Sequence, residues 1–156
     1  MKGFNVPEQG HVVNILPPID INGSGFTSDY FSMGLYSHVD IILTLGVTGA
    51  ASTITLEESD DNSGSSTTAI GFDYYKEETA AGDTLADRAT ATTSGFATST
   101  NDSITYVISV DAAELSDGYP FLVLKGSDPS AATLVSAVAV LSGSRYAQEN
   151  TPTAIT

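Results

Sequence analysis

The chain has 156 residues and lacks cysteine and tryptophan, and its 5 Lys+Arg face 19 Asp+Glu, for a formal net charge of -14. Without cysteine, disulfides, zinc–thiolate sites and a thiol nucleophile are excluded. The five cations stand singly along the chain, so no basic patch is available to neutralise phosphates or anionic lipid. We therefore predict neither nucleic-acid binding nor binding to a membrane.

Long hydrophobic runs are also missing. No segment approaches the ~20 apolar residues that span a bilayer, and the first residues lack the apolar stretch of a secretory signal. Charged residues make up 15% of the chain, against about a quarter in an average domain. Serine, threonine, glycine and asparagine supply the polarity instead, which favours strands and turns over helices. The length fits one domain.

Alternating hydrophobicity is the main positive signal. From His38 the residues Val39, Ile41, Leu43 and Leu45 fall on one face, as expected of a half-buried strand. Segments 52–58 and 68–76 alternate in the same way and are separated by turn residues. The three segments together predict a β-meander.

Further strands are expected downstream. Segment 103–111 places Ile104, Tyr106, Ile108 and Val110 on one face, and segment 119–125 follows a helical turn that Asp111 and Glu114 could cap. Segment 132–141 is apolar on both faces, which predicts a strand covered on both sides.

These segments predict an all-β fold of about seven or eight strands, an antiparallel sandwich or barrel of the jelly-roll or immunoglobulin-like kind. We divide the chain into an N-terminal arm or first strands (1–36), a β-sandwich domain (37–147) and an extended tail (148–156). The arm is rich in aromatic residues and broken by proline and glycine. We expect its rings to be buried, either against the chain's own domain or against a neighbouring subunit.

Catalytic patterns are weak. His11 and His38 are the two imidazoles, and Asp40 lies on the same predicted strand face as His38. No Gly-x-Ser-x-Gly elbow or phosphate-binding glycine loop is present. We predict no catalytic set and no cofactor, and we interpret the histidines as surface or interface residues.

The acidic residues around 57–62 raise the question of calcium, which binds six to eight oxygens. Glu57, Glu58, Asp60 and Asp61 are the candidates, although their spacing does not match an EF-hand. A solvated loop tip is the simpler interpretation, and we predict no metal site. The seven tyrosines could stack on sugars, but core and interface positions explain them more simply.

Three stretches carry a family resemblance: residues 45–58 (LGVTGAASTITLEE), 74–85 (YYKEETAAGDTL) and 138–147 (VAVLSGSRYA). Their pattern of strand and turn residues resembles small virion proteins of tailed bacteriophages, some of which are capsid decoration (cement) proteins. The resemblance extends over most of residues 38–147.

The resemblance implies a non-enzymatic structural protein, made in the host cytoplasm and located on the capsid surface. Its partners would be the major capsid protein and itself, in a homotrimer. The alternatives are a receptor- or glycan-binding module of a head or tail fibre and, third, a cell-surface hydrolase using His38 and Asp40. The expected contact residues are in the arm and near the tail: Phe4, Val6, Phe26, Tyr30, Phe31, Tyr36, Arg145 and Tyr146.

Overall fold

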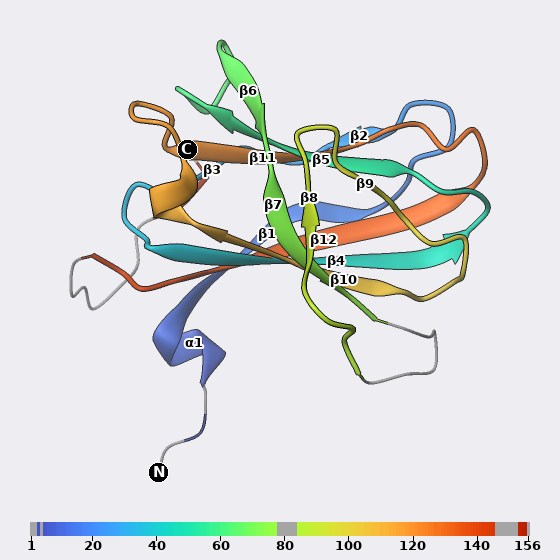
Figure 1. Cartoon of the computed structure of the whole chain (residues 1–156), viewed down its shortest axis with the longest axis horizontal. Helices are drawn as coiled ribbons and strands as arrows, with labels where there is room; N and C mark the ends of the chain where they lie inside the picture. Colours follow the sequence, from blue (N-terminus) through green and yellow to red (C-terminus); the bar gives the residue numbers. More distant parts are fainter. Residues whose placement is uncertain (1–2, 4, 78–83, 146–152, 156) are drawn as a thin grey trace.

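A computed structural model describes residues 3, 5–77, 84–145 and 153–155 of the chain. Two antiparallel sheets face each other, which confirms the predicted all-β fold and, of the sandwich and the barrel, selects the sandwich (Figure 1). Sheet A contains, in spatial order, β1 (Gly10–Asp20), β12 (Thr133–Ser142), β4 (His38–Thr48), β10 (Thr105–Asp111), β7 (Phe72–Lys76) and β8 (Ala89–Ala91).

Sheet B contains β2 (Phe26–Thr27), β11 (Phe121–Gly126), β5 (Thr53–Ser59) and β6 (Thr67–Ile70), with β3 (Phe31–Ser32) paired to β11 and β9 (Phe96–Ala97) paired to β5. The helical elements of the described residues are α1 (Val6–Gln9) and the 3-10 turn η1 (Ala112–Glu114). None of the described helices is long and apolar enough to cross a membrane.

The described residues form more strands than the seven or eight expected, because several strands are very short or divided. β2, β3 and β9 have two residues each, and Gly71 divides the predicted strand 68–76 into β6 and β7. β6 belongs to sheet B and β7 to sheet A, so the chain crosses between the layers at this glycine (Figure 1). A Cβ at position 71 would lie 3.0 Å from the Ala91 carbonyl oxygen, which suits glycine to this corner.

The predicted meander is wrong in its pairing. β5 does pair with β6, but β4 lies in sheet A and β5 in sheet B. The alternation of each strand was correct, because Ile41, Leu43, Ile54 and Leu56 are all fully buried. Two strands that face each other across the core, one in each sheet, show the same alternation of buried and exposed residues as two strands that are hydrogen-bonded neighbours.

The first 36 residues contribute to both layers. β1 is the edge strand of sheet A beside β12, while β2 and β3 extend sheet B along β11. Phe26, Phe31 and Tyr36 are therefore core residues of their own chain. The Ala154 side chain is also buried, and its carbonyl oxygen accepts a hydrogen bond from the Ser32 N–H at 2.8 Å, so residues near the C-terminus pack against β3.

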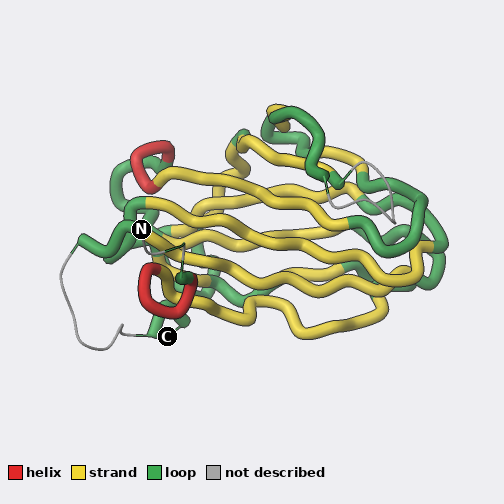
Figure 2. The backbone as a smooth tube through the Cα atoms, turned by 90° about the horizontal axis from the view of Figure 1, so that it is seen from below, coloured by secondary structure: helices red, strands yellow, loops and turns green. Residues whose placement is uncertain are grey.

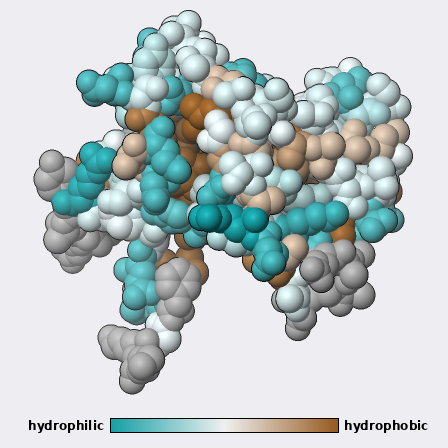
Figure 3. Space-filling model, in the orientation of Figure 1, coloured by the Kyte–Doolittle hydropathy of each residue, from teal (hydrophilic) through white to brown (hydrophobic). Residues whose placement is uncertain are grey.

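An aromatic cluster fills the side of the core where the chain crosses between layers. The Tyr74 and Phe96 rings are stacked with centroids 4.1 Å apart, and Phe96 lies 5.0 Å from Tyr106. The Tyr106 hydroxyl accepts a hydrogen bond from the Ser99 N–H at 2.7 Å. In the space-filling view, hydrophobic residues show between the layers and paler or hydrophilic residues cover most of the surrounding surface (Figure 3).

The outer face of sheet A departs from expectation. β12 buries alternate residues, but Val138 and Val140 on its other face are only partly buried and Leu134 is 44% exposed. On this side α1 (Val6–Gln9) projects beside the start of β1, and none of the described elements lies over the middle of the face (Figures 1 and 2). The prediction that strand 132–141 is covered on both sides is thus wrong for this chain by itself.

Candidate functional site

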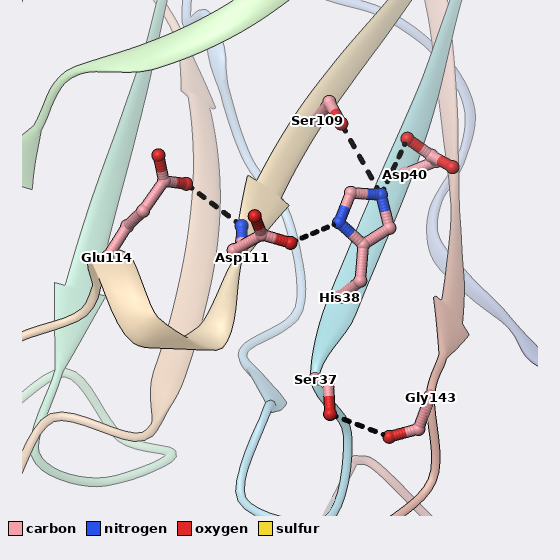
Figure 4. Close-up of polar contacts among 7 residues, drawn as sticks. All are labelled: Ser37, His38, Asp40, Ser109, Asp111, Glu114 and Gly143. Atoms are coloured by element: carbon pink, nitrogen blue, oxygen red, sulfur yellow. Dashed lines mark hydrogen bonds and ion pairs between the residues drawn. The ribbon is translucent and has the colours of Figure 1, made fainter.

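His38 is the centre of the polar cluster most similar to a catalytic site. It begins β4 and lies opposite Asp111, the last residue of β10. Asp40 is two residues further along β4 and pairs with Ser109 of β10. Because alternate residues of a strand point to the same side, these four side chains share the outer face of sheet A (Figure 4).

Both ring nitrogens of His38 face a carboxylate. Nδ1 lies 2.7 Å from the Asp111 Oδ1, and Nε2 lies 3.2 Å from the Asp40 Oδ1. Nε2 is also 3.4 Å from the Ser109 hydroxyl oxygen. Asp111 is held in turn at the start of η1, where its backbone N–H donates to the Glu114 Oε2 at 2.9 Å (Figure 4).

This arrangement favours the charged imidazolium. Partial burial acts to lower the pKa of His38, but the hydrogen bond to Asp111 and the charge of Asp40 outweigh it, so the pKa is raised above 6.5. A neutral imidazole has only one N–H and would turn a lone pair toward one of the carboxylates. With both nitrogens protonated, each carboxylate receives a hydrogen bond from a cation.

The order Ser109–His38–Asp111 matches the connectivity of a serine-hydrolase triad. The triad needs Nε2 free to accept the serine proton, whereas here the Asp40 carboxylate competes for that nitrogen. Ser109 also lies within β10, between two paired strands, instead of on an exposed turn. The geometry therefore suits an ion-pair clamp between β4 and β10 better than a nucleophile and its base.

The surroundings of the clamp are polar and shallow. A depression of about 140 Å³ beside it is also lined by Asp73, Tyr75, Arg88 and Glu114. Arg88 and Asp73 form an ion pair at 3.4 Å, and the Thr90 hydroxyl donates to the other Asp73 oxygen at 2.6 Å. Asp73 is thus paired with Arg88 and Thr90, and a depression of this size would hold few ligand atoms.

The four calcium candidates do not converge. Glu57 bonds the Lys125 ammonium at 2.6 Å, whereas the adjacent Glu58 is buried and accepts from the Ser116 N–H at 2.8 Å. Adjacent residues on a strand point to opposite faces, which explains the separation. Among the described residues no group of three or more His, Cys, Asp or Glu is placed to hold a metal ion.

The two aspartates of this set belong to the β5–β6 loop itself. The Asp61 Oδ1 accepts from the Ser63 N–H and hydroxyl and from the Ser65 N–H. These hydrogen bonds, led by those from Ser65, hold the pKa of Asp61 well below its usual range. The Asp60 Oδ1 accepts from the Ser66 N–H at 3.2 Å. Both carboxylates thus act as loop acceptors.

The expected contact residues divide into three groups. Phe26, Phe31 and Tyr36 are at most 7% exposed, so their expected role as contact residues is corrected: their rings pack inside the chain's own core. Val6 and Tyr30 are half-buried, and Arg145 is exposed at the rim of a hollow that Met33 and Tyr119 also line. Phe4 and Tyr146 lie outside the described residues.

Sequence reasoning identified His38 and Asp40 but missed Asp111 and Ser109 as their neighbours. Asp111 was expected only as a helix cap; it does cap η1, with Glu114 as its capping-box partner, and its carboxylate also bonds His38. The missing information was the β4–β10 register, which joins residues 73 positions apart. No family model, no curated protein and no solved structure matches the chain.

Proposed function

We propose that this chain is a non-enzymatic structural protein of a tailed-phage virion that binds the outer surface of the capsid shell and stabilises it. The non-enzymatic part of this proposal is supported by the contacts of His38, whose two ring nitrogens both face carboxylates. Such an imidazole offers no open nitrogen to a substrate proton, so it is a poor general base. The virion assignment depends on the sequence resemblance of residues 45–58, 74–85 and 138–147.

The rigidity of the fold supports this role. Sheet A pairs β1, β12 and β4 along most of their lengths, so strands from both ends of the sequence are held in one layer. The described surface depressions are open and shallow, and the fold presents broad sheet faces. A rigid block with broad faces suits binding to another protein surface, since little conformational entropy is lost on docking.

Binding to shells tests the function. The purified chain is mixed with shells of the phage that encodes it, assembled without it, and the shells are sedimented. We expect saturable co-sedimentation and a higher temperature of shell disruption. Shells that neither retain the chain nor change their disruption temperature would contradict the proposal.

The expected homotrimer belongs to the same proposal. Weak contacts made by three linked copies would act together through their high effective concentration on the shell. Sedimentation equilibrium of the free chain measures its stoichiometry, and a monomer at all concentrations would remove the trimer from the proposal while leaving shell binding to be decided by co-sedimentation.

A further inference from the structure

The outer face of sheet A carries a cross-strand row of apolar side chains. Val138 of β12 lies opposite Ile42 of β4, Ile42 opposite Val107 of β10, and Val107 opposite Tyr75 of β7. Val12 and Val140 pair in the adjacent row, toward the β1 edge. We call these six residues the sheet A patch: Val12, Ile42, Tyr75, Val107, Val138 and Val140.

The patch is open to solvent in this chain. Val12 is 53% exposed and Ile42 37%, while the other four are partly buried by their neighbours. Aliphatic residues in the middle of four neighbouring strands form a contiguous surface, and contiguous apolar surface on a folded protein commonly marks a docking site. The sequence pattern of β12 already indicated a covered strand, and the described chain supplies no cover.

Charge is distributed unevenly around the patch. On one side the next row contains Ser136, Thr44 and Thr105, and its one carboxylate among the described residues is that of Glu77, which accepts the Thr105 N–H at 3.2 Å. On the other side lie the carboxylates of Asp40 and Asp73, with Asp111 and Glu114 beyond them. His38 and Arg88 offset part of that charge and leave a net acidic border.

The acidic border of the sheet A patch indicates which kind of partner could bind there. A second copy docked on this patch would bring its own negative charge against the acidic border, which is unfavourable at this face, so the homotrimer of the proposed function would form through another surface. A protein surface with aliphatic residues in its centre and lysine or arginine along one side would match both halves of the face. The segment containing α1 projects on the same side of the sandwich (Figure 1), so α1 would lie beside such a partner.

We propose that the sheet A patch is the docking surface of this chain, and that it binds a protein surface bearing aliphatic side chains with a basic border opposite Asp40 and Asp73. This inference depends on the proposed function, in which the partner surface belongs to the capsid shell. The inference adds that the outer face of sheet A is the one turned toward the shell.

Charge substitutions in the patch test the surface. Val12→Glu and Ile42→Glu place a carboxylate in the apolar row, and each is expected to weaken shell binding at least tenfold. Thr55→Glu, on β5 at the outer face of sheet B, is the matched control and should change binding less than twofold. Val12 lies on the edge strand, so Val12→Glu keeps the test valid if Ile42→Glu does not fold. Thermal unfolding verifies the fold of each variant.

The proposed basic border of the partner surface is tested separately. Binding of the unaltered chain should weaken as NaCl is raised from 50 to 300 mM, roughly the range over which surface charges become screened. Asp40→Asn combined with Asp73→Asn should reduce this salt dependence. Salt-independent binding would overturn the proposed basic border.

The outcomes separate the two proposals. If the unaltered chain does not bind shells, the proposed function fails and the docking surface fails with it. If the chain binds and both patch variants bind equally well, the function stands and the docking surface is wrong. Loss of binding in Thr55→Glu alone would move the contact to sheet B. Self-association that Val12→Glu abolishes would identify a second copy as the occupant and overturn the partner proposed here.

Discussion

At the scale of single residues, polar groups of this chain are bonded to partners distant in the sequence. Glu58 is 2% exposed and accepts a hydrogen bond from the Ser116 N–H, while Asp102 accepts from the Thr48 N–H at 2.7 Å. Both carboxylates join a strand to a loop more than 50 residues away. Such bonds stabilise the fold because a backbone N–H left without an acceptor on burial costs free energy.

His38 gives the first prediction at this scale. Its pKa is raised in the folded state, so its contribution to stability is fully present below the unfolded value of about 6.5 and is lost as pH rises through the folded pKa. The free energy of urea unfolding should therefore fall more steeply with increasing pH, from about 6.5 upward, in the unaltered chain than in His38→Gln.

Two variants control this measurement. Asp111→Asn removes the shorter of the two carboxylate contacts and should reduce the pH dependence, whereas Asp117→Asn changes an exposed carboxylate outside the clamp and should not. Equal pH slopes in the unaltered chain and in His38→Gln would show that protonation of His38 in the clamp does not stabilise the fold.

Tyr106 gives the second prediction. Its side chain is 1% exposed and its hydroxyl accepts the Ser99 N–H. Tyr106→Phe leaves that N–H without its acceptor, so the free energy of unfolding should fall by about 1–3 kcal/mol. Chemical denaturation measures the change. Tyr119→Phe is the control, because the Tyr119 hydroxyl makes a longer, exposed contact of 3.4 Å with the Ser66 hydroxyl, and it should cost less.

At the scale of elements, the corners between layers depend on particular glycines. Gly95 lies in the turn between β8 and β9, with φ +74 and its N–H bonded to the Thr92 carbonyl oxygen. A Cβ at this position would overlap the Ile54 carbonyl oxygen of β5. Close approach of the turn to β5 is what allows the chain to move from sheet A to sheet B here.

The third prediction compares Gly95 with a glycine of similar backbone conformation. Gly23 has φ +83, but a Cβ there would have no neighbour within 4 Å. Gly23→Ala should cost about 1–2 kcal/mol for the left-handed conformation alone. Gly95→Ala should cost more, since the turn must also move away from β5. Thermal and chemical unfolding measure the loss of stability in both variants. Equal losses would contradict a close contact between the Gly95 turn and β5.

At the scale of the whole molecule, the balance of charge is extreme. Four described ion pairs, two of them with His38, engage few of the 19 acidic residues, so most of the negative charge is not neutralised within the chain. Self-repulsion of this kind destabilises a compact state and is weakened by salt.

The fourth prediction follows from that charge. Raising NaCl from 10 to 150 mM should increase the melting temperature by a few degrees, because screening relieves repulsion over distances beyond about 10 Å. Sucrose at matched osmolality is the control for general solvent effects. A melting temperature that falls with salt would mean that attractive ion pairs dominate the electrostatics.

Much of the fold could be predicted from the sequence, because the side-chain period of a strand is local. Val39, Leu43, Ile54, Ile108 and Val110 were all assigned to buried faces, and all are buried. An antiparallel all-β fold, sandwich or barrel, followed from the number of such strands and the absence of a helical period, and the two separate sheets of the structure decided for the sandwich. The exclusion of thiol chemistry followed from composition alone.

Only the tertiary structure decided which strands are neighbours and what meets between them. It placed β4 and β5 in different sheets, brought Asp111 to His38, separated Glu57 from Glu58 and buried Phe31 in the chain's own core. It also left the outer face of β12 uncovered. Alternation along a strand fixes which way each side chain points, whereas partner and register depend on hydrogen bonds between segments far apart in the chain, which no local pattern specifies.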